Sequence, residues 1–359
     1  MQSLNNLVSN SATQKPFIKN LRVKNFTCFE NLELTNCGRA NLLLANNNCG
    51  KTNLLRAIDL VVARCKNGGF SKNTQHTEFS RSIIKILKKT NSLPQLNERQ
   101  LASVSNKIIL KALNLFVNFY SPQNDFTIET DLNNNETTKI LINFKSCCKS
   151  IQSLEISKDY DGIYPVMHSL YLETELTDYI LELYELTLDL KIEDLLKTIS
   201  ELIVNNLTTV RGHANDLVKF FMNDTSMSTT LGWQGNGLKR MITIALLVIY
   251  NKDSAVIIDE VDNGLHYNRY EDFAKMILKS AELANTQVFI TTHSREFAKV
   301  FLQTAAEFKK PDSDKTFNED VKTYRLYKKG NGVVAADYGN ATASLKEIDF
   351  NNNSFTRDV

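Results

Sequence analysis

The sequence lacks the features that mark several classes of protein. None of its six cysteines forms a C-x-x-C pair, and Cys147 and Cys148 are adjacent, so neither a zinc site nor a disulfide framework is indicated. The net charge is only +2, which excludes a global basic field for nucleic acid and would confine any such contact to a local patch. We therefore expect reduced thiols and an otherwise ordinary globular chain.

Segments that would direct the chain to a membrane are also missing. Residues Met1–Gln14 are polar and contain no hydrophobic signal core, and the apolar segment Ile242–Tyr250 is too short to span a bilayer. We expect a cytoplasmic protein with no membrane partner. With 359 residues, of which 42% are hydrophobic, the chain can bury a substantial core.

Two adjacent carboxylates follow an apolar segment late in the chain. The run Val256-Ile-Ile-Asp-Glu260 is typical of a buried parallel strand with acids at its carboxyl end. There, Asp259 could hold Mg²⁺ through its water shell, and Glu260 could orient or deprotonate an attacking water. The alternative is a strand followed by an acidic loop, and this run alone does not separate the two.

A phosphate-binding loop is indicated far upstream. The strand-like run Ala40–Ala45 leads into a polar loop, and an amphipathic helix begins near Asn53. Loop N–H groups and the helix N-terminus attract phosphates, Lys51 would reach the β and γ phosphates, and Thr52 would offer its hydroxyl to Mg²⁺. The nucleotide-binding residues predicted here are Asn46, Asn47, Asn48, Cys49, Gly50, Lys51, Thr52 and Asn53. Ala45 replaces the first glycine of the usual pattern, and alanine tolerates positive φ poorly, so we expect a less tight loop entry.

Two further segments have the residue types of a phosphate site. Gly235, Asn236 and Gly237 precede an apolar helix over Leu238–Tyr250, whose N-terminus would attract an anion, although a plain glycine turn is the simpler interpretation. The strand-like run Thr286–His293 ends in a histidine one helix after the acidic pair, which places His293 where it could sense a γ-phosphate.

The rest of the chain organises around these motifs. We predict a disordered lead over residues 1–16, an N-terminal lobe over 17–75, an inserted region over 76–225 and a C-terminal lobe over 226–359. Within the insertion, strand-like runs occupy 108–120, 125–131, 138–144, 152–157 and 166–172, and residues 174–206 have the periodicity of a helix that packs in a core or a dimer.

The order of these motifs resembles the ABC-class ATPases of the SMC, RecF and OLD group. The matching residues are Asn47 with Gly50–Asn53, Gly235–Arg240, Ile258–His266 and Gln287–Ser294. The resemblance is closest to the small ATPases related to the overcoming-lysogenization-defect (OLD) nucleases, which include ATPase subunits of anti-phage systems such as PARIS and Septu. It implies an α/β ABC-type head with a mixed sheet and a helical insertion.

The resemblance also implies roles for particular residues. Two heads would sandwich two Mg·ATP, with Lys51, Thr52 and Asp259 on nucleotide and metal, Glu260 as catalytic base and His293 as γ-phosphate sensor. The Gly235–Gly237 backbone would contact the partner's phosphate, because Trp233 stands where these signatures often have serine. ABC heads carry a Mg²⁺-sensing glutamine after the strand expected at 166–172; here Glu173 and Thr174 are the candidates.

The implied partners are a second copy of the chain and a separately encoded effector, which would be a nuclease, a Toprim protein or a toxin. Too few residues follow His293 for a Toprim domain of its own, so we expect a stand-alone ATPase without nuclease activity. DNA is a further candidate partner, through the basic stretch 81–89, which otherwise is a solvated helix face. A DNA-repair or DNA-clamp ATPase of RecF type, and an ATP-binding scaffold with little turnover, are the alternative functions.

Overall fold

The computed structural model of the chain describes residues 18–46, 49–65, 126–132, 137–145, 150–156, 169–170, 207–213, 216–222, 228–230, 236–250, 255–310, 313–330 and 332–350. No helix among these residues is long and apolar enough to cross a membrane.

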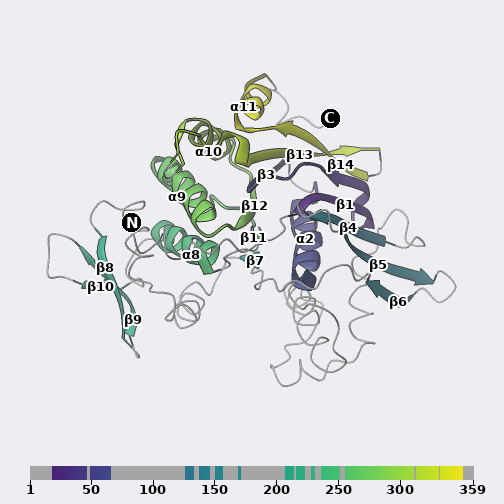
Figure 1. Ribbon diagram of the computed structural model, residues 1–359, viewed down its shortest axis with the longest axis horizontal. Helices are drawn as coiled ribbons and strands as arrows, with labels where there is room; N and C mark the ends of the chain where they lie inside the picture. The colour runs from purple at the N-terminus through teal and green to yellow at the C-terminus, as the bar shows by residue number, and fades with distance from the viewer. Residues whose placement is uncertain are drawn as a thin grey trace.

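A six-stranded mixed sheet lies at the centre of the structure, with the strand order β14-β13-β3-β12-β11-β7 (Figure 1). Its strands are β3 (Ala40–Ala45), β7 (Ser169–Leu170), β11 (Ala255–Ile258), β12 (Gln287–Thr292), β13 (Val321–Lys329) and β14 (Gly332–Gly339). All neighbours pair in parallel except β14, which returns antiparallel to β13. The parallel order places the carboxyl ends of β3, β11 and β12 at one edge of the sheet.

Apolar side chains on both faces explain why these strands are buried. Leu42 and Leu44 of β3 belong to one hydrophobic cluster, whereas Leu43 and Ala45 belong to another on the opposite face. This alternation is the period-two geometry of a strand covered on both sides. The helices of the first face are α8 (Asn236–Tyr250), α9 (Tyr270–Leu283), α10 (Arg295–Glu307) and α11 (Ala341–Phe350), and α2 (Lys51–Cys65) packs on the second.

A second sheet contributes to the other cluster. Its antiparallel strands follow the order β2-β1-β4-β5-β6. They are β1 (Ile18–Phe26), β2 (Phe29–Leu34), β4 (Phe126–Leu132), β5 (Thr137–Lys145) and β6 (Ser150–Ile156). A separate three-stranded sheet has the order β10-β9-β8, formed by β8 (Leu207–His213), β9 (Asp216–Met222) and β10 (Ser228–Thr230).

Local sequence accounts for the ends of α9, which separates the two strands that carry the site. Glu271 and Asp272 lie in its first turn, where carboxylates complement the positive helix terminus. At the other end Asn285 adopts a φ of 51°, and the Thr286 N–H donates to the Ala281 carbonyl at 2.9 Å. This left-handed C-terminal cap stops the helix and turns the chain directly into β12.

The predicted α/β class with a mixed sheet is confirmed. Strands expected at 125–131, 138–144 and 152–157 correspond to β4, β5 and β6, and α8 begins two residues earlier than predicted. β7 covers only Ser169–Leu170 of the strand expected over 166–172. The disordered lead, the basic stretch 81–89, the strand at 108–120 and the helix at 174–206 lie outside the described residues, and the domain boundaries stay predictions.

We expect Phe297→Ala to destabilise the fold by about 3–5 kcal/mol, because it leaves a cavity where α9 and α10 meet. Phe297 is fully buried, and its ring lies 5.2 Å from that of Tyr270, 5.9 Å from Phe273 and 5.8 Å from Phe301, measured between centroids. Urea unfolding measures the loss. Gln303→Ala, at an exposed position of the same helix, serves as the control and should shift the free energy by less than about 0.5 kcal/mol. Equal stability of the two variants would contradict this packing.

Candidate functional site

The phosphate-loop sequence folds as a strand, a loop and a helix. Ala45 ends β3 without a positive φ, so alanine is accommodated at the position where the usual pattern has glycine. The left-handed residue is Gly50, with a φ of 78°, and its carbonyl accepts from the Leu54 N–H at 2.9 Å to start α2. A Cβ at Gly50 would lie 2.5 Å from the Cys28 sulfur, so glycine is required here for both conformation and space.

Lys51 is held at the mouth of this loop. Its side chain is almost fully buried, and Nζ donates to the carbonyls of Ala45 at 2.8 Å and Asn46 at 3.2 Å. Burial lowers the pKa of the ammonium, while the charges of Cys49, Asp259 and Glu260 oppose this effect. The lysine is therefore a desolvated cation beside the loop, with strong attraction for an anion.

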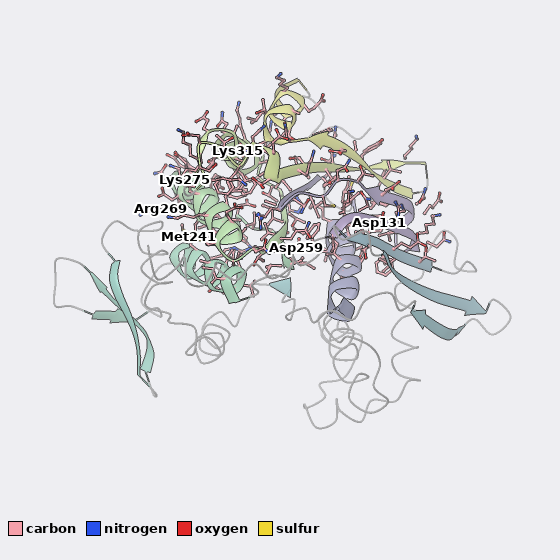
Figure 2. All side chains as sticks on the ribbon, in the orientation of Figure 1. Asp131, Met241, Asp259, Arg269, Lys275 and Lys315 are labelled. Atoms are coloured by element: carbon pink, nitrogen blue, oxygen red, sulfur yellow. The ribbon has the colours of Figure 1, made fainter. Side chains whose placement is uncertain are left out.

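Asp259 lies where the ends of β11, β12 and the phosphate loop meet, between α2 and the helices of the other face (Figure 2). Its Oδ2 accepts from the Thr52 hydroxyl at 2.9 Å, and its Oδ1 accepts from the Thr291 hydroxyl. Thr291 Oγ1 in turn accepts from the Glu260 N–H at 2.8 Å. One carboxylate thus connects three segments that are distant in the sequence.

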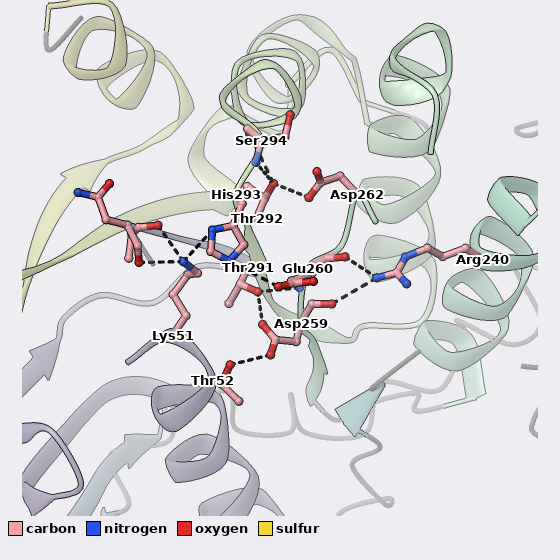
Figure 3. A network of polar contacts seen from close by, with 12 residues as sticks. Lys51, Thr52, Arg240, Asp259, Glu260, Asp262, Thr291, Thr292, His293 and Ser294 are labelled. Atoms are coloured by element: carbon pink, nitrogen blue, oxygen red, sulfur yellow. Dashed lines mark hydrogen bonds and ion pairs between the residues drawn. The ribbon is translucent and has the colours of Figure 1, made fainter. Parts of the chain in front are cut away.

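Glu260 and His293 face each other beside Lys51 (Figure 3). His293 Nε2 lies 3.5 Å from Glu260 Oε1, and Nδ1 lies 3.3 Å from Lys51 Nζ. A neutral imidazole with its proton on Nε2 satisfies both contacts, because Nδ1 then accepts from the ammonium. Both side chains are roughly half exposed, at 41% for His293 and 50% for Glu260, so they remain accessible to a bound molecule.

A cavity of about 550 Å³ opens beside Lys51 and His293, a volume in the range of small-molecule sites; Asp259 and Glu260 are not among its lining residues. Its lining combines the phosphate loop with the histidine of β12 and one cysteine from the β1–β2 turn. The lining residues are Cys28, Cys49, Gly50, Lys51, Thr52, Asn53 and His293. Cys28 has no counterpart in the sequence expectations, since a turn cysteine carries no local signal of its place beside the loop.

The oxygens next to the cavity suit Mg²⁺. The Thr52 hydroxyl and the Asp259 carboxylate are adjacent, and Mg²⁺ takes one or two protein oxygens together with phosphates and waters. Among the residues that the structure describes, no three His, Cys, Asp or Glu side chains cluster as an all-protein metal site. This donor set therefore fits an ion that arrives with a nucleotide, and not a resident structural metal.

Two polar residues that the sequence motifs did not assign support the site. Arg240 of α8 donates to backbone carbonyls of the turn after β11, and Asp262 of that turn accepts from the Thr292 hydroxyl. The Ser294 N–H donates to Thr292 Oγ1 at 2.9 Å, so both neighbours of His293 are fixed. The available signal for Arg240 was its place on the buried stripe of an apolar helix, where a charge needs a partner.

Not all predicted site residues come together. Asn47, Asn48 and Gly235 lie outside the described residues, as do Trp233, Glu173 and Thr174. Asn236 begins α8 and Gly237 follows it, and Gly237 is not among the residues that line the cavity. A Cβ on Gly237 would lie 3.2 Å from the Gly264 carbonyl oxygen, so this glycine allows α8 to pack against the turn after β11.

Comparison with known proteins identifies related sequences. The family described as "AAA domain, putative AbiEii toxin, Type IV TA system" matches residues 79–298, which is more than half of the chain. An "ATP/GTP phosphatase" of Helicobacter pylori is 28% identical over 137 residues, which cover 37% of this chain and 35% of that protein. An uncharacterized protein of Methanocaldococcus jannaschii is 36% identical over 73 residues, covering 20% and 64% of the two chains. The chain thus spans less than two thirds of each of these relatives.

Solved structures share the fold. The SMC head domain of Thermotoga maritima matches with a TM-score of 0.50 and 12% identity, covering 89% of this chain and 98% of that one. An SMC head bound to the C-terminal winged-helix domain of ScpA gives a TM-score of 0.55 at 11% identity, with coverages of 90% and 98%. At such identities the likeness concerns the fold alone, and it confirms the predicted ATPase-head architecture.

We expect Thr291→Val to destabilise the fold by about 1–3 kcal/mol, because the Glu260 N–H and one Asp259 oxygen both lose their hydroxyl partner. Thr291→Ser keeps the hydroxyl and should retain most of that stability. Chemical denaturation of the two variants measures the difference. If Val and Ser variants unfold at the same denaturant concentration, the hydroxyl does not hold the site together.

Proposed function

The chain belongs to the family described as "AAA domain, putative AbiEii toxin, Type IV TA system", and we propose that this AAA-type ATPase hydrolyses ATP to control a separately encoded effector. One observation carries the proposal. Three segments that are distant in the sequence meet beside one cavity, and they bring together Lys51, Thr52, Asp259, Glu260 and His293. These are the residue types that phosphoryl transfer to water requires.

The phosphate loop would bind the triphosphate of ATP. Lys51 would turn from the carbonyls of Ala45 and Asn46 to the β and γ phosphates, whose negative charges compensate its buried charge better than neutral carbonyls do. The N-terminus of α2 adds its unpaired N–H groups. Thr52 and Asp259 would hold Mg²⁺, which when bound neutralises charge on the phosphate oxygens.

Glu260 is the proposed general base. Its carboxylate would take a proton from a water molecule while the water oxygen attacks the γ-phosphorus, and the bond to the bridging oxygen of ADP breaks. His293, with its Nε2 proton directed at this region, would donate a hydrogen bond to the γ-phosphate. The half-exposed position of both groups supports these roles because the reactants must reach them.

Lys51→Ala should abolish ATP binding, whereas Glu260→Gln should keep binding and lose turnover by about 10²–10⁴-fold, since charge attraction and proton transfer are separate functions. Fluorescent-nucleotide titration and phosphate release measure the two effects. Matched controls on α9 are Lys275→Ala and Glu271→Gln, which break an ion pair outside the site; Lys275→Ala also removes the contact with the Phe308 ring. Undiminished phosphate release by Glu260→Gln would remove this residue from the mechanism.

A second copy of the chain is the proposed first partner. Asn236 and Gly237 of the predicted glycine loop begin α8, and Gly237 is not among the residues that line the cavity of its own chain. This loop could bind a phosphate only if another head supplied it. The resemblance to ABC heads, in which two heads enclose two nucleotides, supports a head-to-tail dimer around ATP.

ATP should drive Glu260→Gln into a dimer, and Gly237→Glu should prevent this, because a carboxylate at α8 repels the partner's phosphate. Light scattering with and without ATP measures the mass. Gly237→Ala is the steric control, since any Cβ at this position approaches the Gly264 carbonyl. If Gly237→Glu and Gly237→Ala both leave the ATP-dependent dimer as stable as in Glu260→Gln alone, Gly237 does not contact the partner's phosphate. If both substitutions abolish the dimer to the same extent, Gly237 serves packing within one head.

The effector is proposed from the family to which the chain belongs and from the resemblance of its motifs to those of OLD-like ATPases. The family description names a putative toxin of a type IV toxin–antitoxin system, and the resemblance to OLD-like ATPases supports a role in anti-phage defence. An SMC head that binds ScpA offers a parallel for a head that docks a separate protein. A neighbouring gene for a nuclease or toxin would support this function, whereas a neighbourhood of DNA-repair genes would favour the RecF-type alternative.

A further inference from the structure

One guanidinium holds three successive carbonyls of the turn that carries the acidic pair. Arg240 Nε donates to the Val261 carbonyl at 3.1 Å, and Nη2 donates to the carbonyls of Asp259 at 3.3 Å and Glu260 (Figure 3). Successive carbonyls in a strand point in opposite directions. Here the carbonyls of residues 259–261 all accept from the Arg240 side chain, so the backbone has left the extended conformation and turns at these residues.

Glu260 has an unusual backbone conformation within that turn. Its φ is 47°, in the left-handed region that residues with side chains rarely adopt because it is energetically unfavourable for them. Such a conformation persists only when its surroundings determine it. The Thr291 hydroxyl holds the N–H of Glu260, and Arg240 holds its carbonyl. The two contacts fix the peptide groups on both sides of the carboxylate.

The Arg240 side chain is buried, and burying its positive charge costs free energy unless polar or charged groups compensate it. Only 5% of Arg240 is exposed, and burial lowers its pKa to about 10, with attraction to Asp262, Glu260 and Asp259 opposing the shift. It therefore stays protonated at neutral pH. An apolar side chain of similar volume would fill this place on α8 without the cost of burying a charge. The three carbonyls account for the charge.

α8 contacts the same turn at a second point. Gly237, one helical turn before Arg240, packs against Gly264 and Leu265, with an added Cβ 3.2 Å and 3.3 Å from their nearest atoms. The N-terminal part of α8 therefore contacts the turn after β11 at two places, residues 259–261 and residues 264–265. A displacement of α8 would carry the turn with it, because closely packed elements move together.

We propose that Arg240 is a positioning residue, which fixes the carboxylate of Glu260 for proton transfer by holding the backbone of that residue. The inference rests on the proposed function, in which Glu260 is the base. It deepens that function because it assigns a residue outside the cavity lining to the placement of the base. Arg240 touches neither the nucleotide cavity nor the reacting atoms, so it acts through the backbone of Glu260.

The test compares Arg240→Gln and Arg240→Lys with the full-length protein. Arg240→Gln removes the charge and most of the donors, whereas lysine keeps the charge but lacks the fork that reaches three carbonyls. Arg39→Gln is the matched control: this partly buried arginine also approaches a backbone carbonyl, that of Ala281 at the other end of α9. Each variant is measured for ATP affinity, turnover and hydrogen–deuterium exchange over residues 259–265.

We expect Arg240→Gln to lower turnover by at least about tenfold while ATP affinity stays within about threefold, because the phosphate loop is untouched. Exchange should rise over residues 259–265 and not in β3 or α2, and lysine should restore part of the turnover. In the Glu260→Gln background Arg240→Gln should cost nothing further, since both changes remove the same function. If Arg240→Gln does not fold, Arg240→Lys carries the same comparison.

Two results would separate the failure of this proposal from that of the proposed function. Normal turnover in Arg240→Gln beside an inactive Glu260→Gln would overturn only the role of Arg240. Full turnover in Glu260→Gln would instead remove the base on which both proposals depend. A parallel fall of affinity, turnover and thermal stability in Arg240→Gln, additive with Glu260→Gln, would make Arg240 a packing residue and overturn the inference.

Discussion

The carboxylate of Asp259 is the contact on which the rest of the site depends. Asp259 directly follows β11, Thr291 lies in β12, and Thr52 lies in α2, the helix after β3. The two carboxylate oxygens of Asp259 accept from Thr52 and Thr291, and so they connect these three segments at one edge of the sheet. Hydrogen bonds to a charged oxygen are stronger than those between neutral groups. Through Thr291 the same carboxylate fixes the backbone of Glu260, and so the proposed metal-binding and proton-transfer positions share one support.

Much of this arrangement follows from the sequence, because parallel strands bring their carboxyl ends together. The apolar runs before Asp259 and His293, and the strand–loop–helix pattern around Lys51, were sufficient to predict that these residues share a site. The α/β fold was predictable for the same reason, since buried strands alternate with amphipathic helices from residue 237 onward. The start of α8 falls two residues before the predicted one, a difference of the size by which helix ends commonly vary.

Other features depend on contacts between distant segments that no local pattern reveals. Cys28 lines the cavity because the β1–β2 turn packs against Gly50. Arg240 reads from the sequence as part of a glycine signature, and only the packing of α8 on the turn after β11 gives it three carbonyls. Ala45 replaces a glycine of the usual pattern, and the structure accommodates it because β3 extends through Ala45 and the left-handed conformation falls at Gly50.

The left-handed backbone of Glu260 places two demands on one position that no single amino acid meets well. Glycine would adopt a φ of 47° without strain, but it has no carboxylate, whereas glutamate supplies the carboxylate at a conformational cost. Selection for a more stable fold and selection for the proposed proton acceptor therefore oppose each other here. In the proposed mechanism, residue 260 keeps an unfavourable backbone conformation for the sake of chemistry, and Thr291 and Arg240 hold that conformation in place.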